Sequence, residues 1–168
     1  YLTALRLEEI KKSENLALLI KPFRIRSIMR TQDNIPFPAK KQKKTKYMWR
    51  DIERRAQKYA LPVPKTSVPY PLQNFDLANK VGLVANNEGW YLEYLREAYK
   101  VWFLEGKEAG SEQNLKDMLQ NLGKNFYETI EKSKEQLIDK EYISNTDEAL
   151  NKGIFGAPSF SVGDEFFG

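Results

Sequence analysis

Apolar residues recur at helical spacing along most of this chain. Leu2, Leu5 and Ile10 share one stripe near the start, and the charged residues between them fall outside it. The same periodicity predicts helices over residues 2–14, 47–61, 75–87, 90–105, 112–122, 125–139 and 146–152. We expect Thr146 to cap the last of these helices and Gly153 to lie just past its end.

Two stretches have the pattern of strands instead. Leu16–Ile20 is a continuous apolar run that Pro22 closes, which is typical of a strand buried on both faces. Near the other end, residues 159–162 alternate in polarity, Gly163-Asp164 is a two-residue turn signal, and residues 165–167 read as a returning strand. The sequence therefore predicts one buried strand and one antiparallel hairpin.

Prolines and lysines interrupt the helical pattern in the first half of the chain. Residues 24–39 contain Pro36 and Pro38, and because proline is incompatible with a helix interior we expect this segment to be irregular. Five lysines crowd into residues 40–46, and residues 61–71 contain four prolines. The second of these stretches predicts an extended connector.

The order of these elements indicates a fold class. The chain opens with a helix followed by a strand, as if a preceding strand were missing, and it ends on the hairpin. A thioredoxin-type fold has the order βαβ and then αββα, so we predict an α/β thioredoxin-like fold with both ends truncated and a large all-helical insertion. In this interpretation residues 1–39 and 140–168 form the incomplete thioredoxin-like domain, and residues 40–139 form the helical insertion.

Composition excludes several kinds of chemistry. The 168 residues are 41% hydrophobic, enough to fill a core, and they contain no Cys and no His. Disulfide scaffolds, thiolate nucleophiles, Ser-His-Asp triads and Cys/His zinc sites are thereby excluded, and we expect no metal. No apolar stretch approaches the length of a membrane span.

Charge is unevenly distributed between the two halves. Residues 1–65 carry 17 Lys and Arg against 6 Asp and Glu, whereas the rest of the chain is acidic overall. Such a basic half can mark a nucleic-acid surface or a site for an anionic ligand, or it can serve solubility alone. Because the lysine run lacks interleaved aromatic residues, a solvated loop is the favoured interpretation, and we expect no nucleic-acid partner.

Three features are candidates for chemistry. Ala157-Pro158 follows a helix and opens a strand, and in a thioredoxin-type fold such a bond is cis and directs the backbone of the preceding residue into the active cleft; a trans proline at a strand edge is the alternative. Arg24, Arg26 and Arg30 each offer a fork for a carboxylate, and the sequence does not say which of them faces a cleft. The aromatic stripe on residues 90–103 favours core packing over a ligand pocket.

Several segments, in this order, resemble 2-hydroxychromene-2-carboxylate isomerases, a DsbA-like branch of the thioredoxin fold related to kappa-class glutathione transferases. The matching segments span nearly the whole chain: Lys21-Pro22-Phe23, residues 26–32, Asn34-Ile35-Pro36-Phe37-Pro38-Ala39-Lys40, residues 46–55, Asn86-Asn87-Glu88-Gly89-Trp90, residues 153–160 and Gly163-Asp164-Glu165. The absence of cysteine separates the chain from the disulfide-oxidoreductase branch of this fold, which needs a Cys-x-x-Cys pair.

The resemblance implies a bacterial, cytoplasmic enzyme of aromatic catabolism that uses glutathione as cofactor and a small aromatic carboxylate as substrate. The thiolate of glutathione would add reversibly to a conjugated enone, which permits rotation about the former double bond. Position by position, Ala157 would pair through its backbone with glutathione across a cis Pro158, Asn34 would make a polar contact and Lys46 a basic one. Lys43 or Lys44 is the alternative to Lys46.

Two parts of the family pattern are missing from these 168 residues. The activating serine is expected just before Tyr1 and an Asn-Asp pair after Gly168, so no residue of this sequence is assigned a catalytic role, and we expect a longer parent chain. A kappa-like glutathione transferase is the nearest alternative function, and a non-catalytic basic binding protein is the second. A homodimer, common in such families, stays open.

Overall fold

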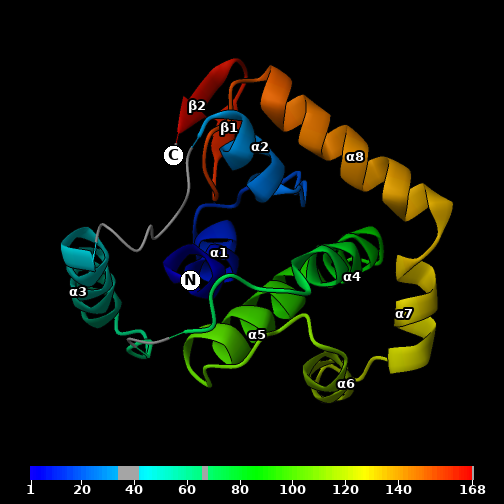
Figure 1. The fold of residues 1–168 in the computed structure, drawn as a ribbon, viewed down its shortest axis with the longest axis horizontal. Coiled ribbons are helices and arrows are strands. Elements are labelled where there is room, and N and C mark those ends of the chain that lie inside the picture. The colour runs from blue at the N-terminus through cyan, green and yellow to red at the C-terminus, as the bar shows by residue number, and fades with distance from the viewer. Residues whose placement is uncertain (34–41, 66–67, 168) are drawn as a thin grey trace.

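Helices make up most of the described chain, which comprises residues 1–33, 42–65 and 68–167 of a computed structural model. Figure 1 shows their arrangement, with a small hairpin at one edge of the molecule near α2 and the end of α8. The elements are α1 (Leu2–Ser13), α2 (Ile25–Thr31), α3 (Gln42–Lys58), α4 (Phe75–Asn87), α5 (Tyr91–Phe103), α6 (Glu112–Asn121), α7 (Phe126–Ser133), α8 (Gln136–Asn151), β1 (Phe160–Val162) and β2 (Glu165–Phe167).

The hydrophobic core lies among α4, α5, α6, α7 and α8. Its fully buried members include Val81 and Leu83 on α4 and Leu115 and Leu119 on α6. Gly82 lets α5 approach closely, since a β-carbon there would lie 3.2 Å from the Tyr91 ring. The face of α4 that carries Gly82 is therefore the face that packs against α5.

The N-terminal part of the chain packs on the outside of this core. α1 contacts α5, and the ring of Tyr1 stacks on Phe103 with centroids 4.9 Å apart. α3 lies against α1, where the guanidinium of Arg6 lies 3.6 Å from the centroid of the Tyr59 ring. The proline-rich connector is extended in its described residues. The Tyr1 hydroxyl donates to the Pro62 carbonyl at 2.6 Å and so links the start of the chain to this connector.

Two expectations for the first 40 residues need correction. Residues 25–31 form the helix α2 rather than irregular chain, because Ile28 is buried and the prolines that forbid helix lie further on. Residues 16–24 are extended but form no strand ladder with any described residue. Their carbonyls find side-chain donors instead: Asn86 Nδ2 donates to Ile20 O and Asn145 Nδ2 to Pro22 O, both at 3.0 Å.

The helices predicted over 125–139 and 146–152 also have different bounds. The first divides at Lys134-Glu135, and the second is the end of α8, which runs without interruption from Gln136 to Asn151. Thr146 is consequently no cap. It lies inside α8, where its hydroxyl donates to the Tyr142 carbonyl at 2.7 Å and accepts from the Arg24 amide at 3.0 Å.

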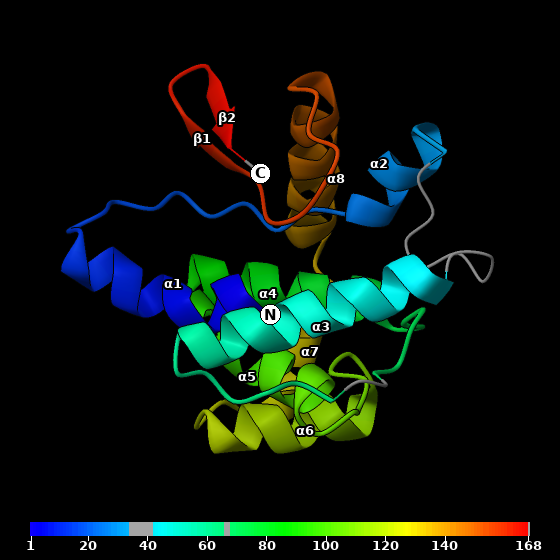
Figure 2. The same ribbon diagram turned by 90° about the vertical axis from the view of Figure 1, so that its left-hand side faces the viewer.

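The predicted hairpin is confirmed. β1 and β2 pair antiparallel, with Phe160 opposite Phe167 and Val162 opposite Glu165, around a turn whose Gly163 has φ 59°. Gly153 ends the preceding helix with φ 73°, as expected. In Figure 2 the extended segment 16–24 crosses the molecule between the layer of α1, α3, α4 and α5 and the hairpin with α8. The division into two domains stays a prediction, and its boundary at residue 140 falls within α8.

Candidate functional site

The loop between α8 and β1 places Ala157 and Pro158 at the surface. Their peptide bond is cis, as the sequence predicts, and the Ser159 hydroxyl steadies the turn by donating to Gly156 O at 2.8 Å. The amide and carbonyl of Ala157 make no hydrogen bond within the described part of the chain. This backbone unit is therefore available to pair with an extended ligand.

Two cavities adjoin at Ala157. One, of about 290 Å³, extends along α1 and residues 18–23; the other, of about 340 Å³, extends between α2, α4 and α5. Asn79, Tyr91 and Tyr99 line both of them. A ligand bound at Ala157 could thus extend into either of the two cavities.

The larger of these two spaces, which we call the aromatic cavity, has walls of aromatic rings. Its ring-bearing members are Tyr70, Phe75, Tyr91, Tyr94, Tyr99 and Trp102. The polar atoms of two of them already have partners: Tyr94 donates to Ala78 O at 2.6 Å and Trp102 Nε1 to Pro69 O at 2.8 Å. Burial raises the pKa of Tyr91, Tyr94 and Tyr99, so their hydroxyls stay neutral.

The aromatic stripe of α5 consequently has two roles. Trp90 and Tyr94 belong to the core, where their rings meet edge to face at 6.0 Å. Tyr94 also lines the aromatic cavity, together with Tyr91, Tyr99 and Trp102. The interpretation of this stripe as core holds for one part of it, and the sequence contained no signal for the other part because both share the same helical periodicity.

A network of hydrogen bonds joins one residue of the cavity wall, Asn79, to α8 and to Arg24. Arg24 binds Asp76 through two parallel contacts, Nε to Oδ1 at 2.8 Å and Nη2 to Oδ2 at 2.6 Å. The Tyr142 hydroxyl donates to Asp76 Oδ1 at 2.9 Å and accepts from Asn79 Nδ2 at 2.8 Å. Burial raises the pKa of Tyr142 to about 12. The network thereby orients Asn79 in the cavity wall.

Sequence reasoning singled out none of Asp76, Asn79 and Tyr142. Asp76 lies in the first turn of α4, where an acidic residue is expected for helix stability alone. Only Arg24 carried a signal, as one of three arginines proposed as carboxylate forks. The structure shows that the carboxylate it binds is the protein's own.

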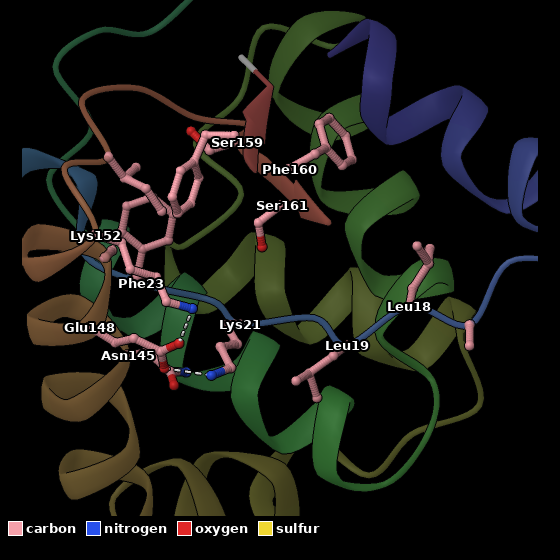
Figure 3. A pocket seen from close by; sticks show the side chains of 14 residues that line it. Leu18, Leu19, Lys21, Phe23, Asn145, Glu148, Lys152, Ser159, Phe160 and Ser161 are labelled. Atoms are coloured by element: carbon pink, nitrogen blue, oxygen red, sulfur yellow. Dashed lines mark hydrogen bonds and ion pairs between the residues drawn. The ribbon is translucent and has the colours of Figure 1, made fainter. Parts of the chain in front are cut away.

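A third space, which we call the strand groove, separates residues 17–23 from β1. It has a volume of about 380 Å³ and is shown in Figure 3. Leu19 is 83% exposed on one side of it, and Phe160 and Phe166 are partly exposed on the other. At its end Glu148 accepts from Lys21 at 2.5 Å and from Lys152 at 2.7 Å, which joins the extended segment to α8.

Of the other predicted glutathione contacts, the lysines of α3 do not line either cavity at Ala157. Lys46 is exposed on α3, and neither cavity at Ala157 is lined by any described residue of that helix. Its alternatives Lys43 and Lys44 are also exposed there. Asn34 lies outside the described residues. Within the described ranges no group of His, Cys, Asp and Glu side chains is suited to hold a metal ion, and no helix has the length and apolarity to cross a membrane.

Comparison with known proteins places the fold. A solved 2-hydroxychromene-2-carboxylate isomerase superposes with a TM-score of 0.82 at 21% sequence identity, over 99% of this chain and 81% of that one. The comparison with curated protein sequences finds no match. The DSBA-like thioredoxin domain family matches residues 1–168, which confirms the predicted thioredoxin-like fold with its helical insertion. The chain therefore belongs to the DSBA-like thioredoxin domain family.

Proposed function

We propose that this protein is a glutathione-dependent cis–trans isomerase that interconverts 2-hydroxychromene-2-carboxylate and trans-o-hydroxybenzylidenepyruvate. The observation that carries the proposal is the aromatic cavity, which opens beside Ala157, whose backbone makes no hydrogen bond with the described residues. A flat aromatic substrate suits walls made of aromatic rings. The structural likeness to an isomerase that acts on such a compound supports the same assignment.

The residues around Ala157 fit glutathione as a small extended peptide. The amide and carbonyl of Ala157, which have no partner in the described part of the chain, can pair with it in the manner of an added strand, beside the ring of Pro158. Asn34 and Lys46 (or Lys43 or Lys44) are its further proposed contacts. When bound, glutathione supplies a thiolate that adds reversibly to the conjugated enone of the substrate and leaves again after rotation.

The chain's own residues bind and enclose the substrate in this proposal. The rings of Phe75 and Trp102 offer apolar surface to an aromatic ring and exclude water from it. The tyrosines of α5 remain neutral, because burial raises their pKa, and so place no negative charge beside a thiolate. Asn79, oriented by Tyr142, presents an amide to the space that the two cavities share.

The proposal is tested by following the interconversion of the two substrate forms by ultraviolet absorbance, with and without millimolar glutathione. We expect turnover only with glutathione. S-methylglutathione is the matched control, because it keeps the peptide backbone and lacks the free thiol. It should raise the midpoint of thermal unfolding by several degrees, as glutathione does, without supporting turnover. Absence of both stabilisation and turnover would contradict the proposal.

A kappa-like glutathione transferase would use the same contact at Ala157 and is the alternative. Transfer of glutathione to an aryl halide, in place of isomerisation, would identify it. A basic binding protein is the remaining candidate, since α3 presents Lys43, Lys44 and Lys46 to solvent. Binding to nucleic acid that weakens steeply with salt, together with no effect of glutathione on stability, would favour that function.

A further inference from the structure

The three arginines around α2 differ in what they contact. Arg24 has both sides of its fork occupied by Asp76. Arg30 is exposed at the end of the helix. Arg26 alone of the three lines the aromatic cavity. Arg24 lines a separate pocket with Lys80, Asp139 and Asp147. Of the three arginines, Arg26 is therefore the one that faces the cavity beside Ala157.

Arg26 is held by rings and not by an acid. Its guanidinium carbon lies 4.3 Å from the centroid of the Phe75 ring and 5.5 Å from that of Tyr70. No carboxylate of the described residues pairs with it. Contacts with ring faces hold a guanidinium without consuming its N–H donors, so these donors stay available to a ligand.

The rest of the cavity increases the effect of this one charge. Arg26 is the only charged side chain among the described residues that line it. The surrounding rings lower the local dielectric constant, which strengthens the attraction between a guanidinium and a bound anion. A partly buried cation without a counter-ion also favours ligands that supply one.

We infer that Arg26 determines specificity for substrates that carry a carboxylate next to an aromatic ring. The guanidinium binds the carboxylate through its fork, and the rings of Phe75 and Trp102 cover the aromatic part of the ligand. Ala157 lies in the wall of the same cavity. The inference rests on the proposed function, and it adds which residue selects the acid and which arginines do not.

Cinnamate and cinnamamide test this directly, because they share ring and chain and differ in the charge of one group. By calorimetry, without glutathione, we expect the wild type to bind cinnamate at least tenfold more tightly than cinnamamide. Arg26→Met should abolish that preference and leave cinnamamide binding within twofold. The matched control Arg30→Met, four residues further along α2, should keep the preference.

Arg26→Lys is a second variant that tests the inference if Arg26→Met does not fold. A lysine keeps the charge and loses the fork, so it should retain part of the preference for cinnamate. A preference that survives in Arg26→Met, or that is missing from the wild type, would overturn the inference. Because no glutathione is present, the outcome is independent of catalysis: an Arg26-dependent preference without isomerase turnover would contradict the proposed function and leave the inference standing.

Discussion

The hydroxyl of Tyr142 donates to Asp76 Oδ1 at 2.9 Å and so links α8 to α4 across 66 positions of the chain. The same hydroxyl accepts from Asn79, whose side chain reaches the cavity wall. Tyr142 thus joins α8 to a residue of the candidate site.

Tyr142→Phe should destabilise the protein by about 1–2 kcal/mol, because it leaves the Asn79 amide and one oxygen of Asp76 without this partner in a partly buried position. Denaturant unfolding measures the change. Tyr127→Phe removes the same atom from a side chain that is 69% exposed and should have an effect below about 0.5 kcal/mol. Equal effects of the two variants would contradict the structural role of the network.

Stability should decrease in acid through Glu148. Its contacts with Lys152 and Lys21 lower the pKa of its carboxyl from the ordinary value of 4.5 to about 2. A pKa lowered by folding stabilises the protein above pH 4.5, and this contribution is lost as the pH falls from there towards 2.

Glu148→Gln tests this prediction in a pH series of unfolding experiments. All the groups involved are substantially exposed, so the difference from the wild type near pH 6 should stay below about 1 kcal/mol and vanish near pH 2. Glu9→Gln is the control, since Glu9 is exposed and forms no ion pair with the described residues. A pH-independent difference would show that the ion pairs are not its cause.

Gly110→Ala should be among the most disruptive small substitutions. A β-carbon at this buried position would lie 2.2 Å from the Asn74 carbonyl oxygen, which is backbone and can move only with the start of α4. We expect a loss of about 1–3 kcal/mol, measured as a lower unfolding midpoint. Gly156→Ala, where a β-carbon meets nothing within 4 Å, should be tolerated. Tolerance of both would mean that this approach of the two segments is not as close as described.

Truncation to alanine should destabilise the protein far more at Leu119 than at Leu137. Leu119 is fully buried in the core, and Leu119→Ala should cost about 2–5 kcal/mol. Leu137 is 67% exposed at the start of α8, and Leu137→Ala should cost less than about 0.5 kcal/mol. A large loss in Leu137→Ala would contradict the exposure of Leu137 at the start of α8.

The helices of the core were predictable because Val81 and Leu115 recur on faces that are actually buried. The hairpin was predictable because Gly163 is suited to the positive φ of its turn. Strong periodicity and turn-forming residues are local properties of the sequence, so the elements that they predict do not depend on distant contacts.

The remaining features depend on contacts that no local pattern contains. α2 escaped prediction because its helical state rests on the burial of Ile28 against other elements. Thr146 has the composition of a cap, but its hydroxyl serves Arg24, 122 positions away. In the candidate site, Ala157 was predictable from the cis-proline turn, whereas Asn79 and Arg26 acquire their roles only when α4 and α2 enclose the same cavity.

The core among α4–α8 has a consequence for the opening of the candidate site. Tyr94 is buried in that core, whereas β1 and β2 are exposed along their whole length, so backbone amides of α4 and α5 should exchange with solvent far more slowly than those of the hairpin. Residues of α5 line the aromatic cavity on its protected side, and Ala157, in the loop before β1, lines it on the exposed side. Local unfolding of the loop that carries Ala157 would therefore change one side of the cavity while the helical wall keeps its shape.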